Sequence, residues 1–430
     1  MNIGSLRNSV FVLCLMFTAC VSTAQTQSAA SASRRNDELK YVIYLSRHGV
    51  RSPTGKPEQY AKFSASPWPQ WPVKPGYLTD HGYQLMKIFG AYDRAYLAEQ
   101  GLLAASGCED SSRVTIVADS DQRTRETGKA IAEGMLPGCN VTVHALPEGV
   151  PDPLFHPLSD HAGGEQNLVA DAAIRGRAGG SIDALKDAYR PQLEMLDRIL
   201  AGCGKTPASN AARMSIFNVP AKLAPGDSDH LVEMRGPLAT ASTLSENLLL
   251  EYTEGMNGND LGWGCLTEAN LREAIQLHTA EEDYADRTPY IARLYASNLL
   301  DKIVSSLEQS ASDKPVAGAL DKPGDRVLFL SGHDTNIAAV AGTLGLNWVI
   351  DGRRDDTPPG GALIFELWHL QDGRLLVRAS YMAQTLDEMR TAQTLTPANP
   401  PAIAPVFVPG CTVDCSLQTF SAVVRSAIVK

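Results

Sequence analysis

Short apolar runs, rich in β-branched and aromatic residues, alternate along most of the chain with longer amphipathic stretches. The runs have strand length, and they predict buried strands at 41–46, 114–118, 327–330, 362–368 and 375–381. Apolar residues at helical spacing predict the intervening helices, at 80–99, 122–134, 290–308 and 336–344. This alternation indicates an α/β fold, in which a mostly parallel central sheet is covered by flanking helices.

One long segment departs from this alternation. Residues 165–280 contain helical patterns at 183–201, 239–253 and 270–285, the last running slightly past the segment, and almost no strand signal. We therefore predict an inserted helical domain at 165–280, and an α/β catalytic domain made of 38–164 and 281–430. A length of 430 residues suits two such domains.

The N-terminal sequence is typical of a targeting segment. Arg7 precedes an apolar run at 9–19, which is too short to span a membrane, and small residues follow at 22–24. These features predict a signal peptide at 1–24, a flexible lead-in at 25–37, and export to the periplasm or the medium. A poor lipobox precedes Cys20, so a lipid anchor there is a minority alternative and the one expected route to a membrane.

Composition narrows the classes of function. Apolar residues make up 44% of the chain and charged residues 20%, which are globular values. The formal charge of −10 argues against a partner that is a nucleic acid or an anionic membrane. We expect a monomer that binds small molecules, and an anionic ligand would need a local cluster of basic side chains.

Export changes how the cysteines are interpreted. Six cysteines follow the targeting segment, and an even number in an oxidising compartment favours disulfides. They contain no C-x-x-C pair and have no flanking histidine cluster, so we predict no zinc site. The six residues are Cys108, Cys139, Cys203, Cys265, Cys411 and Cys415.

Polar, chemically active residues follow three of the predicted strands. The three segments are 47–53 (RHGVRSP), 119–125 (DSDQRTR) and 331–336 (SGHDTN). Ligands of open α/β sheets bind outside the carboxyl ends of the strands, where these segments would meet. The planar fork of arginine suits phosphate, because it donates two parallel hydrogen bonds. The sequence therefore predicts a phosphoryl pocket that holds two imidazoles and a carboxylic acid.

This combination of groups favours phosphoryl transfer. An imidazole can attack phosphorus and hold it covalently, while guanidinium groups neutralise the equatorial oxygens. A nearby carboxylic acid can protonate the leaving alcohol. Arginines then supply the positive charge, so we expect neither a metal nor another cofactor.

The same segments resemble a known family. The sequence of 47–53 is similar to the RHGxRxP signature of histidine acid phosphatases, and 331–336 resembles their distal HD motif. Further stretches are similar to bacterial periplasmic phytases, at 68–74, 151–155, 177–182, 287–289 and 356–361. Glucose-1-phosphatases are related but carry Asn after the catalytic histidine, so Gly49 and the HDTN run favour the phytase side.

The resemblance implies a role for each matching residue. It makes His48 the nucleophile and Asp334 the proton donor, inside an α/β domain with a helical domain over its active-site edge. The phosphate would be bound by Arg47, Arg51, Arg123 and His333. Thr54 and Arg287 would belong to the outer substrate pocket, and Asp119 is expected to orient the arginines. The implied reaction is hydrolysis of phosphomonoesters at acid pH, with phytate expected first, and glucose 1-phosphate or a broad range of esters as the alternative.

Two other functional classes share part of the pattern. A cofactor-independent phosphoglycerate mutase has the RHG core, but it is cytosolic, smaller and without such an insert. A non-catalytic phospholigand-binding protein would need the arginines but not both His48 and Asp334. The family resemblance also implies two disulfides, Cys108–Cys139 and Cys411–Cys415, which leaves Cys203–Cys265 by elimination.

Overall fold

The computed structural model describes residues 37–158, 164–204, 213–226, 230–411 and 414–429. The predicted signal peptide at 1–24, the lead-in apart from Asp37, and Cys20 all lie outside these ranges.

Twelve strands and twelve helices make up the regular structure of the described residues. The strands are β1 (Glu38–Arg47), β2 (Val114–Ala118), β3 (Val143–His144), β4 (Lys222–Pro225), β5 (Val232–Arg235), β6 (Val327–Gly332), β7 (Val349–Ile350), β8 (Arg353–Arg354), β9 (Ala362–His369), β10 (Leu375–Ala383), β11 (Ala402–Val406) and β12 (Cys415–Ser416). The helices are α2 (Pro57–Tyr60), α3 (Asp80–Glu99), α4 (Gln122–Met135), α5 (Glu165–Arg177), α6 (Leu185–Ala188), α7 (Arg190–Leu200), α8 (Pro237–Thr253), α9 (Glu268–Tyr284), α10 (Pro289–Ser312), α11 (Asp334–Leu344), α12 (Leu386–Thr391) and α13 (Leu417–Ala427).

The main sheet is mixed, with strand order β11-β10-β9-β1-β6-β2-β3 and β12 beside β10. Its central strands β1, β6, β2 and β3 pair in parallel, which confirms the predicted α/β fold. The remaining strands are antiparallel, because the tight turn at Asp372-Gly373 sends β10 straight back along β9. Every predicted strand and each of the four predicted flanking helices is present.

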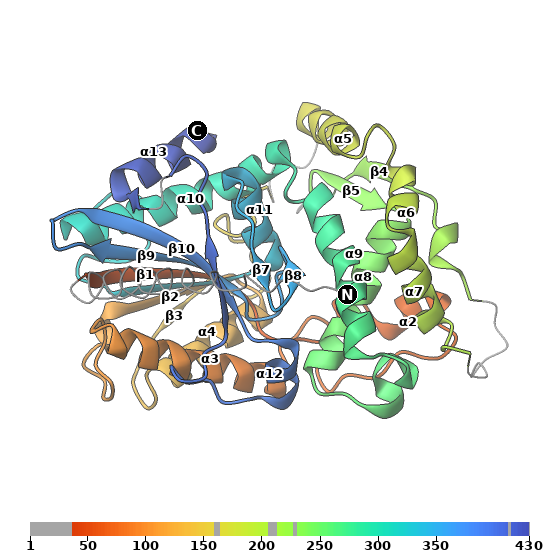
Figure 1. The fold of residues 1–430 in the computed structure, drawn as a ribbon, viewed down its shortest axis with the longest axis horizontal. Helices are drawn as coiled ribbons and strands as arrows, with labels where there is room; N and C mark the ends of the chain where they lie inside the picture. Colours follow the sequence, from red (N-terminus) through yellow and green to blue (C-terminus); the bar gives the residue numbers. More distant parts are fainter. Residues whose placement is uncertain (1–36, 159–163, 205–212, 227–229, 412–413, 430) are drawn as a thin grey trace, which may run out of the picture.

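Helices cover both faces of this sheet (Figure 1). Successive side chains of β1 point to opposite faces, so Tyr41, Ile43 and Leu45 enter one apolar core and Val42 and Tyr44 enter another. The first core includes residues of α10, α11 and α13, and the second includes residues of α3 and α4. This two-sided burial explains why the central strands are continuous apolar runs rather than alternating ones.

The helices α5–α9 lie beside the sheet and its covering helices (Figure 1). They share a third apolar core, to which Val50, Trp68 and Leu386 also contribute. Two details differ from the sequence prediction: β4 and β5 form a short antiparallel hairpin there, and the helix expected at 183–201 is divided into α6 and α7. Pro191, in the first turn of α7, has no backbone N–H with which to continue a helix from α6. The domain boundaries at 164 and 281 stay a prediction.

Disulfides join all three predicted cysteine pairs: Cys108–Cys139, Cys203–Cys265 and Cys411–Cys415. The second pair ties the end of α7 to the loop before α9, within the α5–α9 part of the molecule. Across the described ranges, no helix combines the length and the apolar character that crossing a membrane requires.

Candidate active site

The carboxyl ends of three adjacent parallel strands place the predicted site residues together. In the sheet register Arg47 of β1 lies opposite Gly332 of β6, and Ser331 of β6 lies opposite Ala118 of β2. The segments that follow these strands therefore leave the sheet at one edge, as expected for an α/β ligand site. Side chains from α8 and α9 meet this edge, since Glu246 and His278 contact residues of the first and third segments.

His48 is buried directly after β1, with its ring oriented by the backbone. Its Nδ1 lies 2.8 Å from the carbonyl oxygen of Gly49, which can only accept a hydrogen bond. The proton therefore sits on Nδ1, and the lone pair of Nε2 accepts a long hydrogen bond from Nε of Arg51, at 3.4 Å. Burial, followed by the charges of Arg123, Arg51 and Arg47, holds the pKa of His48 well below the ordinary imidazole value. The structure thus keeps this imidazole neutral in acid, as a nucleophile requires.

The three arginines around His48 are fixed by different partners. Arg47 is fully buried and donates to the carbonyl oxygen of Thr357 at 2.6 Å and to a carboxylate oxygen of Glu246. Arg51 Nη2 lies 3.6 Å from the same Glu246 carboxylate. Arg123 pairs with Asp121 at 2.5 Å, within the first turn of α4. Held in this way, the arginines are pre-organised for an anion and lose little conformational entropy when it binds.

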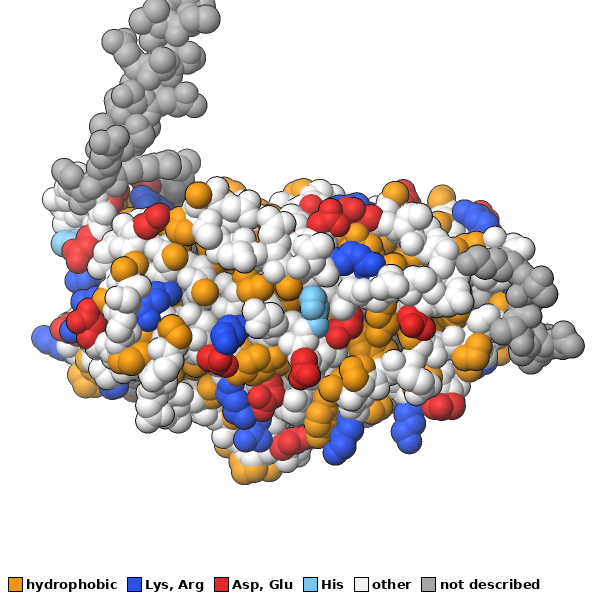
Figure 2. Space-filling view, turned by 90° about the horizontal axis from the view of Figure 1, so that it is seen from below, with side chains coloured by type: hydrophobic (Ala, Val, Ile, Leu, Met, Phe, Trp, Pro, Cys, Tyr) orange, Lys and Arg blue, Asp and Glu red, His pale blue; other side chains and the backbone are white. Residues whose placement is uncertain are grey.

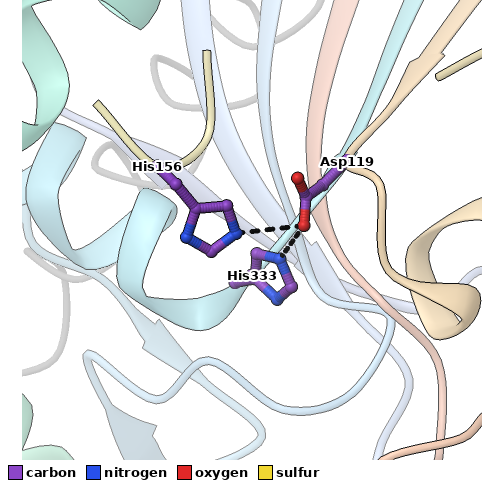
Figure 3. A group of neighbouring side chains, drawn as sticks. All are labelled: Asp119, His156 and His333. Atoms are coloured by element: carbon purple, nitrogen blue, oxygen red, sulfur yellow. Dashed lines mark hydrogen bonds and ion pairs between the residues drawn. The ribbon is translucent and has the colours of Figure 1, made fainter. Parts of the chain in front are cut away.

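Asp119 joins two imidazoles, as Figure 3 shows. Its Oδ2 accepts from Nε2 of His333 at 2.8 Å and from Nε2 of His156 at 3.0 Å. Burial alone would raise the pKa of Asp119, but these two hydrogen bonds outweigh it and hold the pKa well below the ordinary value. The expectation that Asp119 orients the arginines needs correction, because its carboxylate contacts the histidines. It orients His333, whose Nδ1 lies 3.4 Å from Arg123 Nη2.

Asp334 begins α11 and faces Arg47. Its Oδ2 lies 2.9 Å from Nη2 of Arg47 and 3.9 Å from Nε2 of His278. Burial favours the protonated form, yet the nearby Arg47 and His278 outweigh burial and lower the pKa of Asp334. Without substrate, this carboxyl group is therefore ionised and belongs to a network with Arg47 and Glu246.

Within the ranges that the structure describes, two groups of side chains have the composition of a metal site: Asp119, His156 and His333, and His278, Glu282 and Asp334. In the first group the carboxylate oxygen already accepts a hydrogen bond from each imidazole Nε2, so both nitrogens carry protons. In the second group Nε2 of His278 faces carboxylates at 3.8 and 3.9 Å without a hydrogen bond between them.

Thr54 and Arg287 differ in their relation to this cluster. Thr54 is exposed, and Gly76 lies next to both the Thr54 side chain and the guanidinium of Arg123, so Thr54 lies near Arg123 at the surface. The guanidinium of Arg287 instead donates to the Leu346 carbonyl oxygen at 2.6 Å and lies over the ring of Trp348. Among the described residues, its contacts tie it to the loop after α11, and the structure does not bring it to His48.

Three contributors to the site were missed at the sequence level: Glu246 of α8, His278 of α9 and His156 of the loop before α5. Glu246 is 7% exposed and lies between Ser245 and Asn247, in a run of buried residues of a helix that is buried on nearly all sides. A charged residue in such a run is a signal that it has a partner, but the sequence does not say which one.

Comparisons with known proteins agree with this geometry. Residues 38–382 match the family described as the histidine phosphatase superfamily (branch 2). A phytase of Escherichia coli K12 is 36% identical over 414 residues, covering 93% of this chain and 94% of that protein. A glucose-1-phosphatase of Providencia rettgeri is 28% identical over 437 residues, covering 98% of this chain and all of that protein (100%). Among solved structures, a Hafnia alvei phytase bound to myo-inositol hexakis sulphate superposes with a TM-score of 0.83 at 34% identity, covering 92% of this chain and 98% of that one.

Proposed function

The chain belongs to branch 2 of the histidine phosphatase superfamily, and from that premise we propose that it hydrolyses phosphomonoesters, phytate first, through a phosphohistidine on His48. The observation that supports this most strongly is the neutral His48 Nε2, buried among Arg47, Arg51 and Arg123. A ligand-binding protein needs the arginines, but it has no use for an imidazole whose lone pair is kept available.

The first half-reaction transfers the phosphoryl group to the enzyme. Arg47, Arg51, Arg123 and His333 bind its oxygens, and Nε2 of His48 attacks phosphorus in line with the ester oxygen. The N–P bond forms as the P–O bond breaks, and the leaving oxygen takes a proton from Asp334. Phosphate charge offsets that of Arg47, so substrate binding raises the pKa of Asp334 and allows it to carry that proton.

The second half-reaction returns the enzyme to its starting state. The Asp334 carboxylate, now deprotonated, takes a proton from a water molecule as that water attacks phosphorus. The N–P bond breaks and inorganic phosphate leaves, so Arg47 again lowers the pKa of Asp334, which releases its proton and returns to the ionised form. The positive charge needed for both steps comes from arginine side chains already in place.

Phytate is the proposed preferred substrate for two reasons. The chain is 36% identical to a phytase and 28% identical to a glucose-1-phosphatase, each over nearly its whole length. Gly49 after the nucleophile and the HDTN run at 333–336 also favour the phytase side. Thr54, exposed near Arg123, would contact the part of the substrate that lies outside the phosphoryl pocket.

The test is phosphate release at acid pH from phytate, glucose 1-phosphate and p-nitrophenyl phosphate, with His48→Ala as the control. We expect hydrolysis of all three, the highest kcat/KM on phytate, and almost none in the variant. A strong preference for glucose 1-phosphate would support the proposed reaction but would replace phytate by glucose 1-phosphate as the preferred substrate. Absence of hydrolysis of all three would refute the proposed function.

We also propose that the protein acts outside the cytoplasm. The predicted signal peptide at 1–24 and the three disulfides support export. Cell fractionation with N-terminal sequencing tests this, and we expect cleavage after Ala24. A mature N-terminus blocked by a lipid on Cys20 would support a lipid anchor instead. An intact N-terminus in the cytoplasm would contradict export.

A further inference from the structure

Three carboxylates from different helices surround His278. Glu246 comes from α8, Glu282 from α9 and Asp334 from the first position of α11. The Nε2 atom of His278 lies 3.8 Å from an oxygen of Glu246, 3.8 Å from one of Glu282 and 3.9 Å from one of Asp334. Three carboxylate oxygens thus lie within 4 Å of one nitrogen, and the ligand atoms of His278, Glu282 and Asp334 all lie within 4.8 Å of one another. Of the three acids only Asp334 has a proposed part in the reaction.

A hydrogen bond at the other ring nitrogen of His278 orients the imidazole so that Nε2 faces the three carboxylates. Nδ1 of His278 shares a hydrogen bond of 3.0 Å with Oγ of Ser242, which fixes the ring. Nε2 of His278 and Oε2 of Glu246 are both buried, and neither has a hydrogen-bond partner in the described part of the chain. The Glu246 side chain is only 8% exposed, so the structure leaves costly unpaired polar atoms pointing at the same space.

The surrounding charge is strongly negative. Besides the three carboxylates, Asp286 is close enough to raise the pKa of both Glu281 and Glu282, and the positive side chains nearby include Arg47 and Arg51. Burial first, and then the charge of Asp334, raises the pKa of Glu282 well above the ordinary value. An excess of buried carboxylates must be neutralised, either by protons or by a cation.

We propose that His278, Glu246, Glu282 and Asp334 form a binding site for a divalent transition-metal ion such as Zn²⁺. Imidazole and carboxylate are suitable ligands for this class of ion, and the hydrogen bond from Ser242 supplies the outer-shell support that such histidines have. In a tetrahedral site with bonds of about 2.0–2.2 Å the ligand atoms lie about 3.4 Å apart, so an ion would draw each of the three oxygens about half an ångström closer to Nε2 of His278. Asp334 and His278 are 17% and 12% exposed, which gives the ion a path.

Occupancy of this site inhibits the enzyme. A metal ion bound to Oδ2 of Asp334 takes the lone pair that would carry the proton for the leaving group. This consequence rests on the proposed function, whereas binding of the ion does not. The site is therefore inhibitory, and its metal has no part in catalysis.

The experiment measures binding and inhibition separately. Chelator-stripped protein is titrated calorimetrically with Zn²⁺ and spectroscopically with Co²⁺, whose visible absorption reports coordination geometry. Inhibition is measured with glycerol 2-phosphate rather than phytate, because phytate itself chelates these ions. The leaving group of glycerol 2-phosphate is as poor as that of phytate, so its hydrolysis also needs the proton from Asp334. The variants are Glu282→Gln and His278→Gln. The matched control is Asp283→Asn, which removes an exposed carboxylate of the same helix that pairs with Arg177.

We expect one saturable Zn²⁺ site per chain, at least about tenfold weaker binding in each of the two variants, and unchanged binding in the control. Acidification should weaken binding, because protons compete for the ligands. A far-ultraviolet spectrum and a melting curve show whether each variant is folded.

No saturable binding to the wild type, or equal affinity in wild type and Glu282→Gln, would overturn the proposal. Binding without inhibition would remove Asp334 from the ligand set. Intact Zn²⁺ binding by a protein that hydrolyses none of the esters would refute the proposed function and leave the site standing.

Discussion

His48 acquires its chemistry from its neighbours rather than from its own residue type. A solvated imidazole is half protonated near pH 6.5 and therefore a poor nucleophile in acid. Here the Gly49 carbonyl oxygen holds the proton on Nδ1, and burial among arginines disfavours a second proton on Nε2. In the proposed reaction the same arginines bind the phosphoryl group, so substrate binding and activation of the nucleophile would share their side chains.

Asp334 is expected to matter most when the leaving group is poor. In Asp334→Asn we predict a loss of kcat/KM that is at least about a hundredfold for an inositol or glycerol phosphate and much smaller for p-nitrophenyl phosphate, because p-nitrophenolate leaves without a proton. The measurement is kcat/KM on both substrate types for wild type and variant, since kcat/KM reports the steps up to departure of the leaving group and excludes the later attack by water. Equal losses on the two types would show that Asp334 only holds Arg47 in place.

Site residues that lie within sequence motifs could be predicted from the sequence. Site residues that join the site only through contacts between segments far apart in the chain could not. Arg47, His48 and Asp334 follow strands whose register brings them together, and local patterns reveal those strands. Glu246 reaches Arg47 across 199 positions of sequence, and helical periodicity does not specify such a partner. For Arg287 the motif match predicts a place in the outer substrate pocket, and this stays a prediction; the structure shows its guanidinium over the ring of Trp348.

At the scale of elements, helix α8 carries a second buried acid, Glu251, which affects the stability of the fold rather than the active site. Glu251 is 1% exposed, and its carboxylate accepts one hydrogen bond, from the backbone N–H of Gly262 at 2.9 Å. Burial raises its pKa to about 8. The unfolded chain ionises this group from about pH 4.5 upward, while the folded chain keeps it protonated up to about pH 8. The free energy of unfolding therefore decreases as the pH rises from about 4.5 to about 8.

We therefore predict that Glu251→Gln stabilises the protein at neutral pH. The amide oxygen still accepts from Gly262 and never has to ionise, so the free energy of unfolding at pH 7 should rise by up to about 3 kcal/mol, and that at pH 4 should hardly change. Urea unfolding at the two pH values measures this difference. A gain that is equal at both values would contradict a buried, protonated Glu251.

Element prediction succeeded where one periodicity dominates. The bounds of α3 and β2 agree with the expected ranges because each has a clear apolar pattern and well-marked ends, such as the Thr79 cap of α3. The β4–β5 hairpin and β11 were missed, since they are short and β11 contains Pro405 at a position typical of edge strands. β11 pairs with β10, from which α12 separates it along the chain, and the pattern of a short segment does not specify such a partner.

At the scale of the whole molecule, net charge and substrate charge have the same sign. The chain carries −10, yet acidic and basic side chains are interspersed on the face shown in Figure 2. Repulsion from distant carboxylates is screened beyond about 8 Å at physiological salt, so the buried arginines decide binding. This arrangement allows an acidic protein to bind a highly anionic substrate.

The arginine site also predicts the pH profile of the enzyme. Because the pKa of His48 is lowered, the nucleophile stays neutral well below pH 6.5, and rising pH removes the proton that the leaving group needs. Activity on phytate should therefore peak at about pH 4–6 and survive addition of EDTA. A pH series with and without the chelator is the measurement, and a neutral optimum or a loss in EDTA would contradict this account.

The central claim is that His48 carries the phosphoryl group during turnover, and acid-labile trapping tests it most directly. Enzyme mixed with ³²P-labelled ester and quenched within milliseconds in denaturant at alkaline pH should yield one phosphorylated peptide. That peptide should contain His48, lose its label in acid and keep it in base, as a phosphoramidate does. In Asp334→Asn the label should accumulate when the leaving group is p-nitrophenolate, because attack by water lacks its base. Label on another residue, or full turnover by His48→Ala without a phosphorylated peptide, would contradict the mechanism.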